Sequence, residues 1–291
     1  MRKIDYKIDE RFDGKQVQQL LKHYGYSRAI ISSLKHGDGL KCNNNHIRTV
    51  DLLKKGDILT VQMEDKTDII PNDTLKIPVI YENKDMVVFN KPPFMPVHPS
   101  LKHYDDTLAN YFTALYPDCT FRSLNRLDRN TSGIVVVAKN QLTAAVLLKN
   151  DIYHPRKTYY AVVGGDVTQK YGTAGEIIAP IARVSESIIN REVRPDGQYA
   201  HTVFKVIKSN KSMSFLEISL ITGRTHQIRV HFSSIGHPLI GDDLYGGDVS
   251  FMNRQALHCG SAVLVLPEKR DKINVIAPFP DDMQKIIDMI K

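Results

Sequence analysis

The sequence predicts an α+β protein, with a large catalytic domain on a mostly antiparallel mixed β-sheet and a small N-terminal α+β domain. From residue 79 onward, short apolar runs typical of strands recur, while helical patterns are few and do not alternate regularly with them. Residues 12–65 instead carry a helix, a turn and a hairpin pattern. The polar segment 66–78, which contains two prolines, is expected to link this small domain to the large domain of residues 79–291.

The composition favours a globular protein with a polyanionic partner such as nucleic acid. The chain has 291 residues, 42% of them apolar, and a net charge of +7. Residues 12–60 supply more than half of that charge, with eight Lys and Arg against four Asp. No long apolar run or secretory leader pattern is present, and the three cysteines are widely spaced. We therefore expect a cytoplasmic location, no membrane span and no disulfide framework.

Local signals in the small domain predict the order helix, hairpin and strand. Ser27 is placed to cap a helix that runs to about His36, and Gly37-Asp38-Gly39 is expected to end it. A turn at residues 43–45 predicts a hairpin, and Ile58–Met63 alternates as a strand does.

The large domain is predicted to be rich in strands and poor in helices. The expected strands are residues 87–91, 133–139, 158–165, 204–208, 214–222, 226–232 and 263–266. The expected helices are residues 107–115, 141–150 and 281–290.

A single carboxylate stands in a basic loop at residues 123–133, with the sequence SLNRLDRNTSG. Asp128 lies among Arg122, Arg126 and Arg129 and precedes an apolar strand pattern. Neighbouring guanidinium groups favour the ionised carboxylate, which suits a nucleophile or an electrostatic stabiliser. The other interpretation is a loop aspartate paired with an arginine, an interaction that contributes little at a surface.

Residues 220–246 form a second segment with an unusual concentration of polar side chains. If Thr225–Phe232 is a strand, Ile228 and Val230 point to one side of it and Arg229 to the other. Arg229 is then expected to lie away from the core face.

Two histidines in this segment do not have the spacing of metal ligands. His226 and His231 are five residues apart, so they face opposite sides of a strand and miss the helical i, i+4 spacing. The GxxxxGK[ST], GxGxxG, HExxH and GxSxG motifs are also missing from the sequence. We therefore expect no metal, no nucleotide cofactor and no hydrolase triad.

Paired tyrosines stand near the start of the strand RKTYYAVVGG, residues 156–165. Strand alternation places Lys157, Tyr159 and Ala161 on one face and Tyr160 on the other. Only Tyr159 can therefore act on the same side as Lys157. The alternative interpretation is an aromatic side chain that fills the edge of the core.

Three prolines shape the segment NKPPFMPVHPS, residues 90–100, between Lys91 and His98. Proline fixes its own φ angle and lacks an amide hydrogen, which leaves little regular hydrogen bonding. We expect a rigid, extended loop.

These segments resemble the motifs of the RluA-type RNA pseudouridine synthases, and the resemblance covers residues 12–270. This sequence departs from the family pattern at Phe94 for a glycine, Asn125 for a histidine and Cys259 for an alanine. Asn125 cannot titrate near neutral pH, which puts in doubt any role for a histidine at that position. The matching motifs are KPxGxxVHP at 90–99, HRLDxxTSG at 125–133, KxY at 157–159, LxTGRTHQIRVHxxxxGHPxxGDxxYG at 220–246 and RxxLHA at 254–259.

The small domain resembles an S4-like RNA-binding module. The pattern SRxxIxxLxxG, which begins at Ser27, and the later KxGDIL carry this resemblance. It implies an RNA contact that includes Arg28 and Lys35. A solvated basic domain without a ligand is the alternative.

The family resemblance implies an isomerase, an intramolecular transferase that converts uridine to pseudouridine in structured RNA without cofactor or metal. Asp128 corresponds to the catalytic aspartate, Tyr159 to the tyrosine that stacks on the target base, and Arg229 to the arginine that pairs with the aspartate. Arg126 corresponds to the residue that helps displace the base, which is expected to flip out of its stack. Asp128 then either attacks C1′ or acts on the C2′ proton.

Further polar residues of these segments are expected to contact RNA. The expected target is large-subunit (23S) ribosomal RNA, with tRNA as the alternative, and the expected state is a monomer. A catalytically inactive RNA-binding protein is disfavoured because all three catalytic residues are present, and no recognition helix suggests a DNA-binding module. The expected RNA contacts are Arg126, Arg129, Lys91, His98, Lys157, Arg224, Thr225, His226, Arg28 and Lys35.

Overall fold

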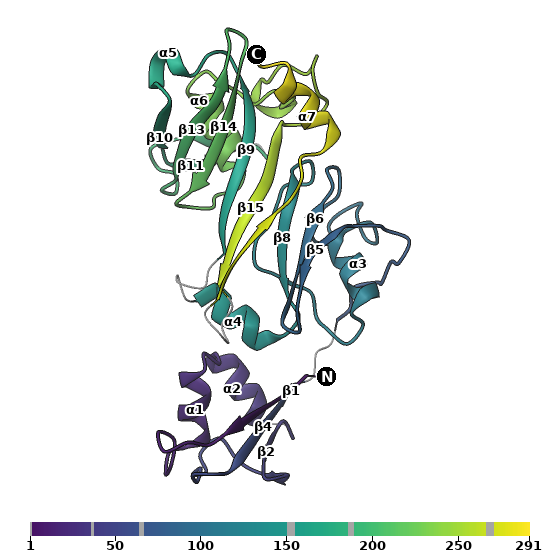
Figure 1. Ribbon diagram of the computed structural model, residues 1–291, viewed down its shortest axis with the longest axis vertical. Coiled ribbons are helices and arrows are strands. Elements are labelled where there is room, and N and C mark those ends of the chain that lie inside the picture. The colour runs from purple at the N-terminus through teal and green to yellow at the C-terminus, as the bar shows by residue number, and fades with distance from the viewer. Residues whose placement is uncertain (1, 36–37, 64–66, 150–154, 186–188, 266–270) are drawn as a thin grey trace.

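The computed structural model describes residues 2–35, 38–63, 67–149, 155–185, 189–265 and 271–291. In this part the chain forms a four-stranded sheet near its N-terminus, a ten-stranded sheet and a two-stranded hairpin. The small unit lies at one end of the elongated large sheet (Figure 1). The predicted α+β fold on a large, mostly antiparallel sheet is confirmed.

The small unit packs two helices against an antiparallel sheet with the strand order β1-β4-β2-β3. Apolar side chains from the helices and from β2 and β4 form its core, which is separate from that of the large unit. Its elements are β1 (Arg2–Lys7), α1 (Val17–His23), α2 (Arg28–Lys35), β2 (Leu40–Cys42), β3 (Asn45–His46) and β4 (Ile58–Met63).

The helix and hairpin signals of the small unit are confirmed. Ser27 Oγ accepts a hydrogen bond from Ile30 N at 3.2 Å at the start of α2. Asn43 and Asn44 have φ angles of 50° and 69° in the turn between β2 and β3. The predicted end of α2 at residues 36–37 lies outside the described residues. Strand β1, which precedes the predicted domain, pairs with β4 along its whole length.

The large unit is organised on a sheet with the order β10-β13-β14-β9-β15-β8-β6-β5, with β16 beside β15 and β7 beside β8. All its pairs are antiparallel except β8 with β15. Its strands are β5 (Val79–Glu82), β6 (Met86–Lys91), β7 (Arg122–Ser123), β8 (Ser132–Ala138), β9 (Arg156–Gly164), β10 (Ala174–Ile178), β13 (His201–Ser209), β14 (Met213–Leu220), β15 (Leu257–Val265) and β16 (Lys272–Ile276).

The helices of the large unit lie beside and at the ends of this sheet (Figure 1). The three predicted helices are present as α3, α4 and α7, although residue 150 lies outside the described part. None of the described helices is long and apolar enough to cross a membrane. The remaining elements are α3 (Leu108–Leu115), α4 (Gln141–Lys149), α5 (Thr168–Tyr171), the hairpin β11 (Ile181–Arg183) and β12 (Arg191–Val193), α6 (Gln227–Ser234), the 3₁₀ turn η1 (Asp243–Tyr245) and α7 (Asp281–Asp288).

The predicted strand at Thr225–Phe232 is wrong, because this segment forms the helix α6. All six residues from Gln227 to Phe232 are buried, so the helix has no polar face that would reveal a period of 3.6 residues. Gln227 Oε1 accepts a hydrogen bond from Arg224 N at 2.9 Å and closes the turn before the helix. Arg229 is therefore separated from its apolar neighbours by about 100° of helical rotation rather than by strand alternation.

Residues 67–78 of the predicted linker lie against the large unit. Ile69 and Ile77 pack on its core, and Asn110 Nδ2 donates a hydrogen bond to Ile70 O at 2.7 Å. This segment therefore extends the surface of the large unit before β5 begins.

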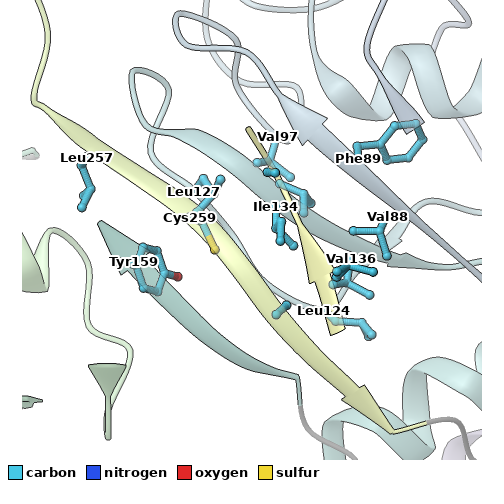
Figure 2. Packing of buried hydrophobic residues seen from close by; sticks show 14 of the residues in the cluster. Val88, Phe89, Val97, Leu124, Leu127, Ile134, Val136, Tyr159, Leu257 and Cys259 are labelled. Carbon is cyan, nitrogen blue, oxygen red and sulfur yellow. The ribbon is translucent and has the colours of Figure 1, made fainter. Parts of the chain in front are cut away.

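The parallel pair of β8 and β15 fixes the strand that follows the Asp128 loop. In its register Gly133 lies opposite Cys259. Gly133 has a φ angle of 113°, and a Cβ atom there would lie 2.2 Å from Cys259 O. Figure 2 shows Cys259 beside Leu127, Ile134 and Tyr159 in the buried cluster. Only glycine allows the two backbones to approach so closely.

We predict that Gly133→Ala lowers the free energy of unfolding by at least about 3 kcal/mol, because it adds overpacking to backbone strain. Gly246→Ala is the matched control, since Gly246 is in the left-handed helical region with a φ angle of 81° but has open space around its Cα. The control is expected to cost about 1 kcal/mol. Urea unfolding of both variants measures the difference, and equal losses would contradict the close approach.

Candidate active site

Asp128 lies in the loop between β7 and β8, at a cavity of about 70 Å³. Its side chain is 31% exposed, and its backbone carbonyl accepts a hydrogen bond from Thr131 N at 3.0 Å. The sequence-predicted residues that line this cavity are Arg126, Asp128, Tyr159, Arg224, His226 and Arg229. Segments far apart in the chain thus converge on one carboxylate.

Buried side chains from two other segments hold the Asp128 loop through its polar backbone and side-chain atoms. Lys91 Nζ donates to Arg129 O at 3.1 Å. Arg254 Nη1 donates to Asn130 O at 3.2 Å. Gln255 Nε2 donates to the Thr131 hydroxyl at 3.1 Å. Each of the three residues that follow Asp128 is therefore held by a hydrogen bond from a buried side chain.

Lys91, for which the sequence predicted an RNA contact, supports the Asp128 loop from inside the protein. The residue is fully buried, and its ammonium group also donates to Pro92 O at 2.7 Å and Met95 O at 2.8 Å. Burial and the nearby Arg254 charge lower the pKa of Lys91 to about 7, while the Asp128 charge acts in the opposite direction.

Asn125, which stands where the family motif has histidine, binds the neighbouring strand. Its Nδ2 donates to Ile134 O at 2.9 Å, and its Oδ1 accepts from Val136 N at 3.0 Å. Both groups of the amide are used in this pair, and Asn125 is not among the residues that line the cavity. Asn125 therefore links the Asp128 loop to β8 through two hydrogen bonds.

Arg229 contacts Asp128, as the family resemblance implied, but its bidentate partner is Asp242. Arg229 Nε and Nη2 each lie 2.7 Å from an Asp242 carboxylate oxygen, whereas Nη1 lies 3.5 Å from Asp128 Oδ2. The Asp242 side chain is fully buried. Burial lowers the pKa of Arg229, but its hydrogen bonds and charge attraction to Asp242 outweigh this and raise the pKa overall. A permanent cation thus faces Asp128.

Tyr245 joins this ion pair to a histidine. Its ring centre lies 4.9 Å from Arg229 Cζ, a cation–π contact. Its hydroxyl lies 2.8 Å from His226 Nδ1 and accepts a hydrogen bond from Arg191 N at 3.0 Å. His226 Nε2 in turn lies 3.8 Å from Asp128 Oδ2. Burial lowers the pKa of His226, although the Asp128 charge opposes this, so the imidazole is neutral near pH 7.

Tyr159 and Tyr160 lie on opposite faces of β9, as strand alternation predicted. Tyr160 packs against Phe215 and Phe279, whereas Tyr159 belongs to the central core and lines the cavity. Burial, followed by the effects of Cys259 and Asp128, raises the pKa of Tyr159 well above its usual value. Tyr159 is therefore a neutral phenol that can donate a hydrogen bond.

Several predicted RNA contacts lie away from this cavity. His98 lies 3.0 Å from Ser123 Oγ and packs its ring edge against Phe121. Lys157 Nζ donates to Pro155 O at 2.9 Å. Arg129 is exposed outside the cavity lining, Thr225 lines a neighbouring cavity, and Arg28 and Lys35 are exposed on α2 of the small unit.

Two residues of this centre, Asp242 and Tyr245, were missed by sequence reasoning. Both belong to the segment GDDLYG, which ends the motif at residues 220–246. The signal was the motif itself, but only the folded chain brings η1 and the residue before it against α6. Within the described residues, no group of three or more His, Cys, Asp or Glu has the arrangement of a metal site.

Asp128, Tyr159 and the buried Arg229 line one cavity, and comparison with known proteins gives the family of the chain. Residues 85–234 match the family model described as RNA pseudouridylate synthase. The chain is 37% identical to the uncharacterized RNA pseudouridine synthase YjbO of Bacillus subtilis, over 93% of this chain and 98% of that protein. It is 31% identical to the ribosomal large subunit pseudouridine synthase D of Haemophilus influenzae, over 91% and 87% of the two chains.

A solved structure agrees with these matches. Human RNA pseudouridylate synthase domain containing 1 aligns with a TM-score of 0.58 and 25% identity, over 72% of this chain and 86% of that one. The chain belongs to the RluA-type RNA pseudouridine synthases, as its motifs predicted. Membership of this family indicates that the protein is an isomerase. The S4-like resemblance of the small unit stays a prediction, because the family match begins at residue 85.

We predict that Asp242→Asn destabilises the protein by about 3 kcal/mol, because it removes the charge that compensates the buried Arg229. Asp243→Asn is the matched control, since it makes the same chemical change at the exposed neighbouring residue. The control is expected to stay within about 0.5 kcal/mol of the original chain. Equal urea midpoints for the two variants would show that the Asp242 pair does not stabilise this centre.

Proposed function

We propose that this protein converts uridine to pseudouridine in structured RNA, with large-subunit ribosomal RNA as the target and tRNA as the alternative. The observation that carries the proposal is the convergence of Asp128, Tyr159 and Arg229 on one cavity. Relatives named ribosomal large subunit pseudouridine synthase D favour the ribosomal target. The net charge of +7 also suits an RNA substrate.

In the proposed reaction, Asp128 works at the sugar of a flipped uridine. In the first route its carboxylate attacks C1′, and the C1′–N1 bond breaks with its electron pair leaving on uracil. The uracil turns, its C5 attacks C1′, and Asp128 leaves; C5 then loses its proton and N1 gains one. In the second route Asp128 removes the C2′ proton while the C1′–N1 bond breaks and uracil leaves with its electron pair, which gives a glycal. C5 then bonds to C1′ as the proton returns to C2′, after which C5 loses its proton and N1 gains one. Both routes need an ionised Asp128, and the Arg229 cation lies 3.5 Å from its carboxylate.

Tyr159 and the arginines at the rim of the cavity are proposed to handle the base. Tyr159 offers an aromatic face and a neutral hydroxyl donor on the same cavity as Asp128. The cavity volume of about 70 Å³ is small for a nucleobase. Arg126 and Arg224 are exposed and line it, so we propose that they move aside on binding. Arg126 would then fill the gap left in the RNA stack.

The small unit is proposed to add affinity for RNA through its exposed cations. Arg28 and Lys35 lie at the two ends of α2, and both side chains are exposed. Contacts of this kind reach phosphates and position the RNA without reading its sequence.

We predict that Asp128→Asn abolishes pseudouridine formation on ribosomal RNA transcripts while RNA binding persists, because the amide is neither a nucleophile nor a base. The measurement is site-resolved pseudouridine detection after incubation in vitro. Asp118→Asn, at an exposed acid outside the cavity lining, is the matched control and is expected to retain full activity. Turnover by Asp128→Asn at the original rate would remove Asp128 from the chemistry. Failure of the original chain to modify any transcript, including tRNA, would contradict the proposed function.

We predict that replacing Arg28 and Lys35 together with Gln weakens RNA binding and lowers its salt dependence. The slope of log K against log salt should fall by about 1.4 if both contact phosphates of single-stranded RNA. Lys3→Gln with Lys7→Gln on β1 is the matched control, because it removes two exposed cations from the same unit. Equal slopes for the two double variants would count against an RNA contact by α2.

A further inference from the structure

The C-terminal helix α7 is packed onto the large unit near the start of β15 (Figure 1). Met283 and Ile286 on its apolar face are buried in a cluster that also contains Ala256. Its first turn carries two adjacent acids, of which Asp281 is exposed and Asp282 is half-buried. The second acid therefore faces the protein, and its partner there decides what it does.

Asp282 forms a bidentate ion pair with Arg254, whose side chain is fully buried. Arg254 Nε and Nη2 lie 2.7 Å and 2.8 Å from the two carboxylate oxygens. Burial raises the pKa of Asp282, but the hydrogen bonds and charge of Arg254 outweigh this and lower the pKa overall. Two parallel hydrogen bonds fix the plane of a guanidinium group, so Asp282 sets the orientation of Arg254.

The guanidinium group held in this way reaches the Asp128 loop. Its remaining nitrogen, Nη1, donates to Asn130 O at 3.2 Å and to Gln255 O at 3.3 Å. Asn130 is two residues from Asp128 in the chain. Without the Asp282 carboxylate, Arg254 would be a buried cation free to turn towards other acceptors, and its hold on the Asn130 carbonyl would weaken.

His258 makes a second link between the C-terminal segment and the same loop. Its Nε2 lies 3.2 Å from Ala277 O, and its Nδ1 lies 2.9 Å from Ser132 Oγ. Burial lowers the pKa of His258 to about 4, so the ring is neutral near pH 7. A carbonyl only accepts, so Nε2 carries the proton and Nδ1 accepts from the Ser132 hydroxyl. Residues 277–282 are thus connected through buried side chains to both Asn130 and Ser132.

We propose that Asp282 is a positioning residue for the reaction at Asp128, and that it acts through Arg254 on the Asn130 carbonyl. This inference rests on the proposed function, because it assigns a supporting role in the same reaction. Asp282 is not among the described residues that line the catalytic cavity. Its loss is therefore expected to slow the chemical step without weakening RNA binding, because a small displacement of a catalytic group lowers the rate strongly.

The test compares Asp282→Asn with Asp281→Asn in the full-length protein. The control makes the same chemical change at the exposed neighbouring acid of the same helix turn. The probe is an in vitro transcript of large-subunit ribosomal RNA, and pseudouridine formation is followed in a single turnover with protein in excess. The rate constant at saturating protein reports the chemical step, and the half-saturating protein concentration reports RNA binding.

Asp282→Asn is expected to lower the rate constant at saturating protein at least about tenfold. The half-saturating concentration should stay within about twofold of that of the original chain, and Asp281→Asn should match the original chain in both quantities. Asp282→Glu keeps the negative charge and is expected to lose less of the rate than Asp282→Asn.

Hydrogen exchange without RNA separates positioning of the loop from general loss of stability. A peptide covering residues 128–132 includes the Thr131 amide, which donates to Asp128 O at 3.0 Å. Its exchange is expected to be about tenfold faster in Asp282→Asn than in Asp281→Asn. The Tyr116 amide, which donates to Phe112 O at the end of α3, should exchange equally in both variants, because α3 lies far from α7 (Figure 1).

Three outcomes would overturn the inference. The first is a rate constant for Asp282→Asn within twofold of that for Asp281→Asn. The second is a rise in the half-saturating concentration with no change in the rate constant, since that indicates an RNA contact. The third is an equal increase of exchange in α3 and in the loop, which indicates general loosening. Faster exchange confined to the loop, in a protein whose original chain modifies no transcript, would contradict the proposed function and not the positioning of the loop.

Discussion

The buried ion pair between Arg229 and Asp242 is the interaction on which the catalytic centre depends. Each charge would be costly in the interior without the other, and their bidentate geometry leaves one guanidinium nitrogen facing Asp128. Tyr245 stacks its ring on the Arg229 guanidinium group, and its hydroxyl is hydrogen-bonded both to His226 and to the backbone of Arg191 in the β11–β12 hairpin. The cation is therefore fixed before substrate arrives, as electrostatic preorganisation requires.

The Asp128 loop meets this cation because it is held from the opposite side. Lys91 and Arg254 bind its carbonyls, and Gly133 lets the following strand enter the sheet beside Cys259. Hydrogen bonds from buried cations satisfy loop carbonyls that regular secondary structure leaves unpaired. A loop would otherwise be the most mobile part of such a site, and a small displacement of a catalytic group lowers the rate strongly. The hydrogen bonds from Lys91 and Arg254 therefore hold Asp128 in a defined position although its side chain is partly exposed to solvent.

Much of this arrangement could be predicted from the sequence, and the exceptions have physical causes. Short apolar runs predicted β6, β8, β9, β13, β14 and the end of β15, and the capping signal at Ser27 predicted α2, because both signals are local. Tyr159 was assigned to the correct face, since strand alternation holds over β9. Helix α6 was missed because its first six residues are all buried, polar and apolar alike, so they show no amphipathic period. The partner of Arg229 and the burial of Lys91 depend on tertiary contacts between distant segments, which spacing does not encode.

The central claim is that Asp128, so held, makes pseudouridine in cellular RNA. The most direct measurement is transcriptome-wide pseudouridine mapping in cells of the source organism that carry the original gene, a deletion, or the deletion complemented with either the original gene or Asp128→Asn. The account predicts at least one uridine in large-subunit ribosomal RNA that loses its modification on deletion and regains it only with the original gene. Restoration by Asp128→Asn, or identical maps in all four strains, would contradict it.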